Sequence, residues 1–101
     1  MLKILQINYR LNSPPADFLC GAEPVADSLA NVPGLRWKIW LKNDAEKDGG
    51  GIYLFENEAA LNDFVSGPIV EKLRAHPAIA EVSLKRFDVP LALSAKTRAP
   101  V

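Results

Sequence analysis

Residues 35–56 read LRWKIWLKNDAEKDGGGIYLFE, two apolar runs separated by a polar stretch that ends in three glycines. The runs at 35–42 and 51–56 are rich in β-branched and aromatic side chains, which favour strands. The polar and glycine residues between them, 43–51, are typical of a hairpin loop. We therefore predict two antiparallel strands at the centre of the chain, with the three glycines in the loop that joins them.

The residues before this hairpin predict a strand followed by a helix. Residues 2–11, LKILQINYRL, alternate apolar and polar side chains as a strand does. Apolar residues then recur every three or four positions across 16–32, which is the spacing of one helix face. Pro24 lies within this stretch and lacks a backbone N–H, so we expect a kink or two short helices there.

The residues after the hairpin repeat this plan. A second helical pattern begins near Glu56, and Pro68 suits the first turn of a further helical piece. Residues 79–88 predict a fourth strand, whereas residues 89–101 show no clear period and are expected to form an extended tail. The order β-α-β-β-α-β predicts one α+β domain over residues 1–101, with the ferredoxin-like fold and a four-stranded antiparallel sheet.

The composition excludes several classes of partner. Twelve Lys and Arg residues balance twelve Asp and Glu residues, so the chain lacks the excess basic charge that nucleic acids or anionic membranes attract. No apolar run approaches the roughly 18–20 residues of a membrane helix. A single cysteine, Cys20, excludes an intramolecular disulfide and favours a reducing compartment. We therefore expect a cytoplasmic domain that binds neither nucleic acid nor membrane.

The predicted sheet is apolar on both faces, although two helices can cover only one. One set of alternating positions, which includes Ile7 and Leu54, is strongly apolar, and the other, which includes Asn8, Tyr53 and Phe55, mixes aromatic with polar residues. An antiparallel sheet with one face in water normally carries polar residues there, and a bare apolar face is a large patch for a monomer. We therefore expect a homodimer in which the uncovered sheet faces meet, helped by the C-terminal tail.

Single residues provide the candidates for chemistry, because no complete catalytic motif or paired-cysteine metal pattern occurs. Gln6 and Asn8 are amides in an apolar strand, and they either hydrogen-bond each other or a helix terminus, or orient a polar atom of a ligand. His76 suits either the C-terminus of a helix or proton transfer. Arg74 is either a solvated helix residue or a cation turned toward a pocket.

The aromatic residues are first of all core and interface residues. Arranged around a void, several of them would form a pocket for a flat apolar ligand. The residues concerned are Trp37, Trp40, Tyr53, Phe55, Phe64 and Phe87.

Three segments carry a family resemblance: Gly34–Trp40, Gly50–Phe55 and Phe87–Leu91. As a set they resemble the YdhR-type monooxygenases, over nearly the whole chain. The resemblance implies a dimeric α/β barrel of two ferredoxin-like protomers, with the tail after Val89 reaching the partner. In the wider superfamily, antibiotic-biosynthesis monooxygenases oxidise fused-ring phenols to quinones without metal or flavin. Their pocket lies between sheet and helices, which implies that the face with Asn8 and the strand-three aromatics looks toward the helices here.

The resemblance also implies roles for particular residues. Arg74 matches the helix-two arginine of the family, and Phe55 stands at the place of its strand-three tryptophan. The family's strand-three asparagine falls near Gly51, and its helical tyrosine falls near Leu61. Haem-degrading members of the superfamily use a helix-two histidine, and His76 falls close to that place.

We therefore predict a monooxygenase that needs no cofactor and acts with molecular oxygen on a small hydrophobic, aromatic, phenol- or quinol-like substrate. The predicted catalytic residues are Arg74, as the stabiliser of the substrate anion, and Tyr53, as a hydrogen-bond donor. No metal site is predicted. The alternatives are a non-enzymatic dimeric module that binds a small apolar ligand, and haem binding through His76. The predicted substrate-binding residues are Gln6, Asn8, Trp40, Phe55, Phe64 and His76.

Overall fold

The computed structural model describes all residues from Met1 to Val101, which form four strands and five helices. The strands are β1 (Lys3–Leu11), β2 (Leu35–Asn43), β3 (Asp48–Phe55) and β4 (Ile79–Asp88). The helices are α1 (Pro15–Leu19), α2 (Glu23–Ala30), α3 (Glu58–Val65), α4 (Pro68–Ala75) and α5 (Leu91–Lys96). None of these helices combines the length and the apolar character that crossing a membrane would require.

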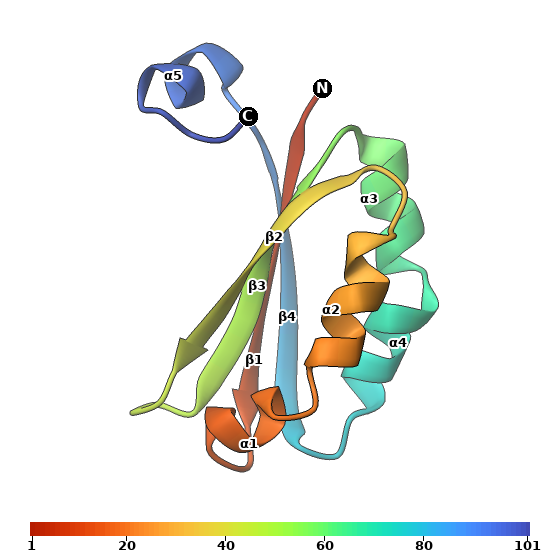
Figure 1. Cartoon of the computed structure of the whole chain (residues 1–101), viewed down its shortest axis with the longest axis vertical. Helices are drawn as coiled ribbons and strands as arrows, with labels where there is room; N and C mark the ends of the chain where they lie inside the picture. Colours follow the sequence, from red (N-terminus) through yellow and green to blue (C-terminus); the bar gives the residue numbers. More distant parts are fainter.

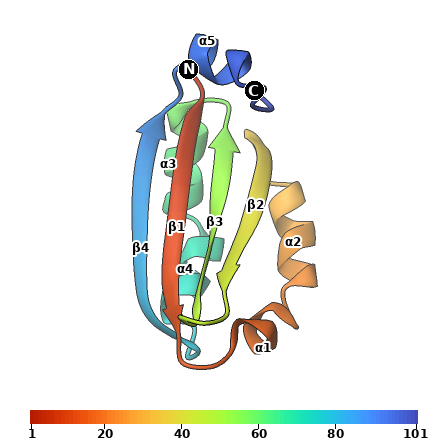
Figure 2. The same cartoon turned by 90° about the vertical axis from the view of Figure 1, so that its left-hand side faces the viewer.

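The four strands form one antiparallel sheet in the order β2-β3-β1-β4. Helices α2, α3 and α4 lie against one face of this sheet, and the other face carries no helix along its length (Figure 1). Figure 2 shows the strands from this open side, with α3 and α4 behind them. The predicted β-α-β-β-α-β order and the ferredoxin-like fold are confirmed.

Prolines divide both helical stretches. The first stretch is interrupted after Leu19 and resumes as α2 with Pro24 in its first turn, so the prediction of two short helices is confirmed. The second stretch is interrupted at Gly67, and Pro68 opens α4. A proline in the first turn of a helix costs no hydrogen bond, because the first N–H groups have no intrahelical partner.

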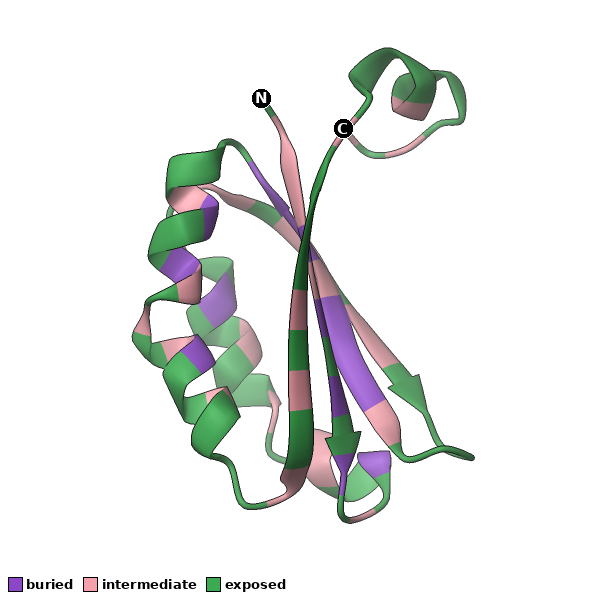
Figure 3. Cartoon of the chain, turned by 180° about the vertical axis from the view of Figure 1, so that it is seen from behind, coloured by how far each residue is buried: buried purple, intermediate pink, exposed green.

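The hydrophobic core lies between the sheet and helices α2, α3 and α4. Figure 3 shows buried residues on the helix surfaces that face the sheet and on the central strands. Two edge strands, β2 and β4, hold no fully buried residue, so the core is centred on β1 and β3. Its buried members are Leu5, Ile7, Tyr9, Leu11, Leu29, Tyr53, Phe55, Leu61, Phe64 and Val70.

The register of the sheet corrects the expected face assignment. Leu5 lies opposite Tyr53 in the β1–β3 ladder, so the odd-numbered residues of both strands face the helices. The expectation that Asn8 shares a face with Tyr53, and that Ile7 shares one with Leu54, is therefore wrong. The sequence shows the alternation within each strand, but the pairing of two distant strands decides which residues of the two strands share a face.

A β-bulge in β2 changes which residues of this strand face the helices. The register against β3 changes between Leu35 and Trp37. As a result Leu35 packs against the core, whereas Trp37 lies opposite Leu54 on the open face. The glycine run of β3 itself pairs with β1 and β2 without a register shift.

The three glycines belong to β3 and not to the hairpin loop, so this prediction is wrong. β3 begins at Asp48, and Gly49, Gly50 and Gly51 are buried and pair with β1. The turn itself precedes them and includes Lys47, whose φ is 56°. A Cβ on Gly50 would lie 2.1 Å from the carbonyl oxygen of Ile7, so close packing of neighbouring strands, and not a turn, requires a glycine there.

The C-terminal segment is helical over part of its length, so the prediction of an extended tail is wrong for Leu91–Lys96. This stretch, LALSAK, contains good helix formers, and Pro90 precedes its first turn. The chain then returns to the sheet, where the indole Nε1 of Trp37 donates a hydrogen bond to the carbonyl of Pro100 at 2.9 Å. α5 thus stands at one end of the sheet, on the side that lacks helices (Figure 1).

Candidate functional site

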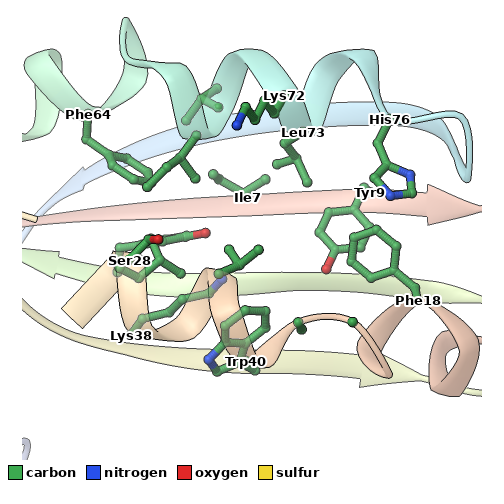
Figure 4. Close-up of a pocket in the computed structure, with 17 residues that line it drawn as sticks. Ile7, Tyr9, Phe18, Ser28, Lys38, Trp40, Phe64, Lys72, Leu73 and His76 are labelled. Atoms are coloured by element: carbon green, nitrogen blue, oxygen red, sulfur yellow. The ribbon is translucent and has the colours of Figure 1, made fainter. Parts of the chain in front are cut away.

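A pocket of about 350 Å³ lies between the sheet and the helices, and twelve of its seventeen lining residues are hydrophobic (Figure 4). Its volume and apolar walls are those of a small-molecule site. The sheet contributes Ile7, Tyr9, Lys38, Trp40 and Tyr53. The helical side contributes Phe18, Gly21, Ala22, Val25, Ser28, Leu29, Phe64, Ile69, Val70, Lys72, Leu73 and His76.

Glycines of β3 lie beneath two of the side chains that line this pocket. Gly49 and Gly51 lie on the helix-facing side of the strand, where they present no side chain. The ring of Tyr9 lies over Gly49, since an added Cβ would be 2.6 Å from its Cε2 atom. The stem of Lys38 lies over Gly51 in the same way, with Cε 2.6 Å from an added Cβ. Side chains of the two neighbouring strands therefore reach over the middle strand.

Two groups of aromatic rings enclose the ends of the pocket. At one end the ring centroids of Tyr9 and Phe18 are 5.3 Å apart, and those of Phe18 and His76 are 5.1 Å apart. At the other end the centroids of Tyr53 and Phe64 are 5.2 Å apart. Such tilted and edge-on pairs are favourable arrangements of aromatic rings. Figure 4 shows Lys38 beside Trp40 between these two ends.

Lys38 is the half-buried cation of the pocket, whereas Lys72 is exposed. The Nζ of Lys38 lies 3.4 Å from the ring centroid of Trp40 and 4.7 Å from that of Tyr53, which are cation–π distances. Burial lowers the pKa of Lys38 to about 8, because apolar surroundings disfavour the charged form. No Asp or Glu lines the pocket.

Three polar side chains of the pocket lining can act as hydrogen-bond donors. Burial raises the pKa of both Tyr53 and Tyr9, and the charge of Tyr9 raises that of Tyr53 further. Both phenols are therefore protonated at neutral pH and can donate to a ligand. The Nδ1 atom of His76 accepts a hydrogen bond from the backbone N–H of Ala78 at 3.0 Å. In the neutral ring this places the proton on Nε2, which is then also a donor.

A family model described as "Putative mono-oxygenase ydhR" matches residues 4–100. The chain belongs to this family. The expectation drawn from Gly34–Trp40, Gly50–Phe55 and Phe87–Leu91 is thereby confirmed. Comparison with curated proteins gave no match.

Solved structures resemble this YdhR-family chain in fold. SnoaB, a cofactor-independent oxygenase from Streptomyces nogalater, matches with a TM-score of 0.70 and 17% identity, over 87% of this chain and 92% of SnoaB. The monooxygenase ActVA-Orf6 of Streptomyces coelicolor, solved with nanaomycin D, matches with a TM-score of 0.67 and 14% identity, over 86% of each chain. The NE2512 protein of Nitrosomonas europaea matches with a TM-score of 0.67 and 21% identity, over 88% of this chain and 89% of that one. At these identities the likeness concerns the fold alone.

Four of the predicted site residues line the pocket of this YdhR-family protein: Trp40, Tyr53, Phe64 and His76. Phe55 does not line it. Phe55 is fully buried beside the pocket, with its ring centroid 5.4 Å from that of Phe64, and it supports this wall from behind.

The structure places the other three predicted residues elsewhere. Arg74 is exposed on α4 and does not line the pocket, although its neighbours Lys72 and Leu73 do. Gln6 and Asn8 lie on the open face of the sheet, where the Gln6 amide Nε2 donates to Asn8 Oδ1 at 3.4 Å. The two amides therefore bond each other, which is one of the two arrangements that the sequence left open.

Sequence reasoning did not single out Lys38 or Tyr9 for the site. A signal was present in WKIW, where a lysine lies two positions before Trp40 in a run that is otherwise apolar. A charged residue at an inward position of such a strand must face either a partner or a cavity. Tyr9 gave no comparable signal, because tyrosine is equally common in a packed core.

Proposed function

We propose that this protein is a monooxygenase that oxidises a small, hydrophobic, aromatic substrate of phenol or quinol type without a cofactor. The observation that carries the proposal is the apolar pocket of a YdhR-family chain, with aromatic walls and several hydrogen-bond donors but no carboxylate. A flat ring fits between such walls, and the donors suit an ionised oxygen. The proposal agrees with SnoaB, which shares the fold and is described as a cofactor-independent oxygenase.

The chemistry needs no external reductant. An electron-rich phenol or enol first loses its hydroxyl proton, and the resulting anion can pass an electron to dioxygen. At the ring carbon conjugated with that oxygen, which carries one hydrogen, one atom of O₂ becomes the new carbonyl oxygen. The other atom leaves as water with this ring hydrogen and the proton released from the hydroxyl group. The substrate itself therefore supplies all the electrons. An apolar pocket assists by limiting the contact of water with the anion and by placing fixed donors beside it.

The pocket residues have distinct roles in this scheme. Tyr53 donates a hydrogen bond to the substrate oxygen, while Trp40 and Phe64 form walls for the ring. His76, which is exposed at the end of α4, lines the pocket and offers Nε2 as a donor there. Because Arg74 lies outside the pocket, this scheme gives it no contact with the substrate.

Oxygen uptake tests the proposal. Purified protein is given anthrones, naphthols and quinols in an oxygen-electrode cell, with heat-denatured protein as the control. We expect uptake of one O₂ for each quinone formed with at least one substrate class, and ¹⁸O₂ should label one product oxygen. Tyr53→Phe should lower kcat about tenfold or more, since a hydrogen bond to a charged group contributes about 1.5–3 kcal/mol.

The second candidate is a binding module without turnover. It is favoured by the position of Arg74, the one residue matched to the family's helix-two arginine, outside the pocket. Tight binding of the same compounds without oxygen uptake would support this module and contradict the oxygenase. Binding of none of them would contradict both.

We further propose that two copies of the chain pair through the open sheet face. Ile39 and Phe87 on this face are 50% and 41% exposed, and Leu91 and Leu93 of α5 are 54% and 70% exposed on the same side of the sheet. A second copy is the occupant that fits, because its own exposed apolar side chains on the sheet and on α5 would cover those of the first copy. An interface of this class buries about 800 Å² per partner.

A further inference from the structure

We propose that the pocket selects aromatic molecules bearing one ionised oxygen, and that the ammonium group of Lys38 is the cation that pairs with this oxygen. The inference rests on the proposed function and narrows its substrate class. It assigns to a residue of β2 the anion-stabilising role that was predicted for Arg74 with the family resemblance.

Contacts within the sheet hold the side chain of Lys38 in position. Its stem lies across Gly51, where any larger residue would meet Cε, and its amine lies against the face of Trp40. In the β2–β3 ladder Lys38 is opposite Tyr53, whose ring is the second aromatic surface near the amine. Figure 4 shows the side chains of Lys38 and Tyr9 both reaching into the space between sheet and helices.

Lys38 has no partner of opposite charge. The two ion pairs of the chain are Lys3–Asp88 and Lys42–Asp44, and neither includes a residue of the pocket lining. The titratable groups that face the pocket with Lys38 are Tyr9 of β1, Tyr53 of β3, Lys72 of α4 and His76. None of these is a carboxylate, so the lining has basic groups and phenols only.

An ionised ligand would provide the negative charge that the pocket lining lacks. A cation in apolar surroundings is unfavourable unless it is paired, and its ring contacts with Trp40 and Tyr53 replace only part of the lost hydration. The lowered pKa of about 8 reflects the same cost, yet still leaves Lys38 protonated by about ten to one at pH 7. A phenolate oxygen beside Nζ would supply the missing charge.

The same ion pair forms from either starting state. A phenolate can bind the ammonium form directly, or a neutral phenol can give its hydroxyl proton to the neutral amine. The second route breaks the phenol O–H bond, forms an N–H bond on Lys38 and leaves the electron pair on the oxygen. Both routes end with the substrate anion that reaction with O₂ requires, held against Trp40.

Binding of 4-nitrophenol tests the assignment, because its neutral and ionised forms have different absorption bands. Nitrobenzene serves as the uncharged analogue. We expect the wild-type protein to bind the ionised form at least about tenfold more tightly than nitrobenzene, as a charged hydrogen bond would give. The bound phenol should also ionise at a lower pH than the free phenol. Lys38→Met should abolish both effects while retaining affinity for nitrobenzene.

Matched variants separate charge from shape. Lys42→Met removes an exposed lysine of the same strand that lies outside the lining, and it should change nitrophenolate affinity by less than about twofold. Lys38→Gln serves as a second variant if Lys38→Met does not fold, as judged by circular dichroism. Equal nitrophenolate binding by wild type and either Lys38 variant would overturn the assignment. A parallel loss of nitrobenzene binding, or an effect of Lys42→Met as large as that of Lys38→Met, would overturn it as well.

The probe also distinguishes this inference from the proposed function, since its binding requires no oxidation. Nitrophenolate binding through Lys38 without oxygen uptake on any quinol supports the inference and contradicts the oxygenase. Oxygen uptake that survives Lys38→Met unchanged contradicts the inference and leaves the oxygenase intact.

Discussion

At the scale of one residue, the charge of Lys38 lowers the stability of the fold, although the proposed site uses this charge. Its amine lies against two aromatic rings and has no carboxylate nearby. Burial favours the neutral amine and lowers the pKa of Lys38 to about 8 from the ordinary 10.5. Between these two pH values the unfolded chain holds a proton that the folded chain has lost, so stability rises with pH across this window. Below pH 8 the full cost of the buried charge is present.

Lys38→Met should therefore stabilise the protein at pH 7 by about 1–3 kcal/mol, because methionine keeps an unbranched stem and removes the buried charge. The difference between variant and wild type should shrink as the pH rises from about 8 toward 10.5. Urea unfolding at several pH values measures it. The raised pKa values of Tyr9 and Tyr53 affect both proteins alike and cancel in the difference. A variant less stable than wild type at pH 7 would contradict this account.

At the scale of one element, β3 combines two demands on its glycines. Gly49 and Gly51 face the helices and leave room for Tyr9 and Lys38. Gly50 points the other way, and the backbone of β1 leaves no space for a Cβ there. The glycines of one strand thus leave room for two pocket side chains and allow the backbone of β1 to pack closely.

Gly50→Ala should destabilise the fold by at least about 2 kcal/mol, because the obstacle is backbone and cannot rotate away. The added Cβ would lie 2.1 Å from the Ile7 carbonyl oxygen and 3.2 Å from Asn8 Cα. Gly21→Ala is the control, since nothing lies within 4 Å of its added Cβ, and it should change stability by less than about 1 kcal/mol. Denaturant midpoints compare the two, and equal midpoints would show that β3 tolerates the side chain.

At the scale of the whole molecule, the sheet has two different surfaces. One is filled by helices α2, α3 and α4 and encloses the pocket, while the other remains open with α5 at its end (Figure 1, Figure 2). The open surface is not uniformly apolar. Residues such as Ile39, Leu41 and Ile52 lie over β2 and β3, whereas Ser83 and Lys85 lie over β4. A partner should therefore centre on the β2–β3 half.

The homodimer proposal predicts a mass of about 22 kDa in solution, twice the 11.1 kDa of one chain. Ile39→Asp places a charge at the centre of the apolar half and should shift the mass toward 11 kDa, as measured by light scattering during size-exclusion chromatography. Ala59→Asp adds the same charge on the exposed side of α3 and should leave the dimer intact. A wild-type protein that remains at the monomer mass at micromolar concentration would refute the pairing.

Local patterns predicted those parts of the fold that depend on neighbours along the chain. Pro24 and Pro68 act through their own missing N–H groups, so the division of both helical stretches followed from the sequence. The prediction that the three glycines lie in the hairpin loop is wrong because a tight loop and a closely packed strand both require glycine. The helix at Leu91–Lys96 was missed because six residues are too few to show a period.

The sequence by itself determined the order of elements, the two-faced apolar sheet and four of the residues around the pocket, since these follow from side-chain type and spacing. Only the tertiary structure decided that Tyr9 and Lys38 enter the pocket while Gln6, Asn8 and Arg74 do not. For the strand residues the reason is the register between β1 and β3, whose paired residues lie 38 to 52 positions apart, together with the bulge in β2. A shift of one residue in such a pairing exchanges every inward side chain for an outward one.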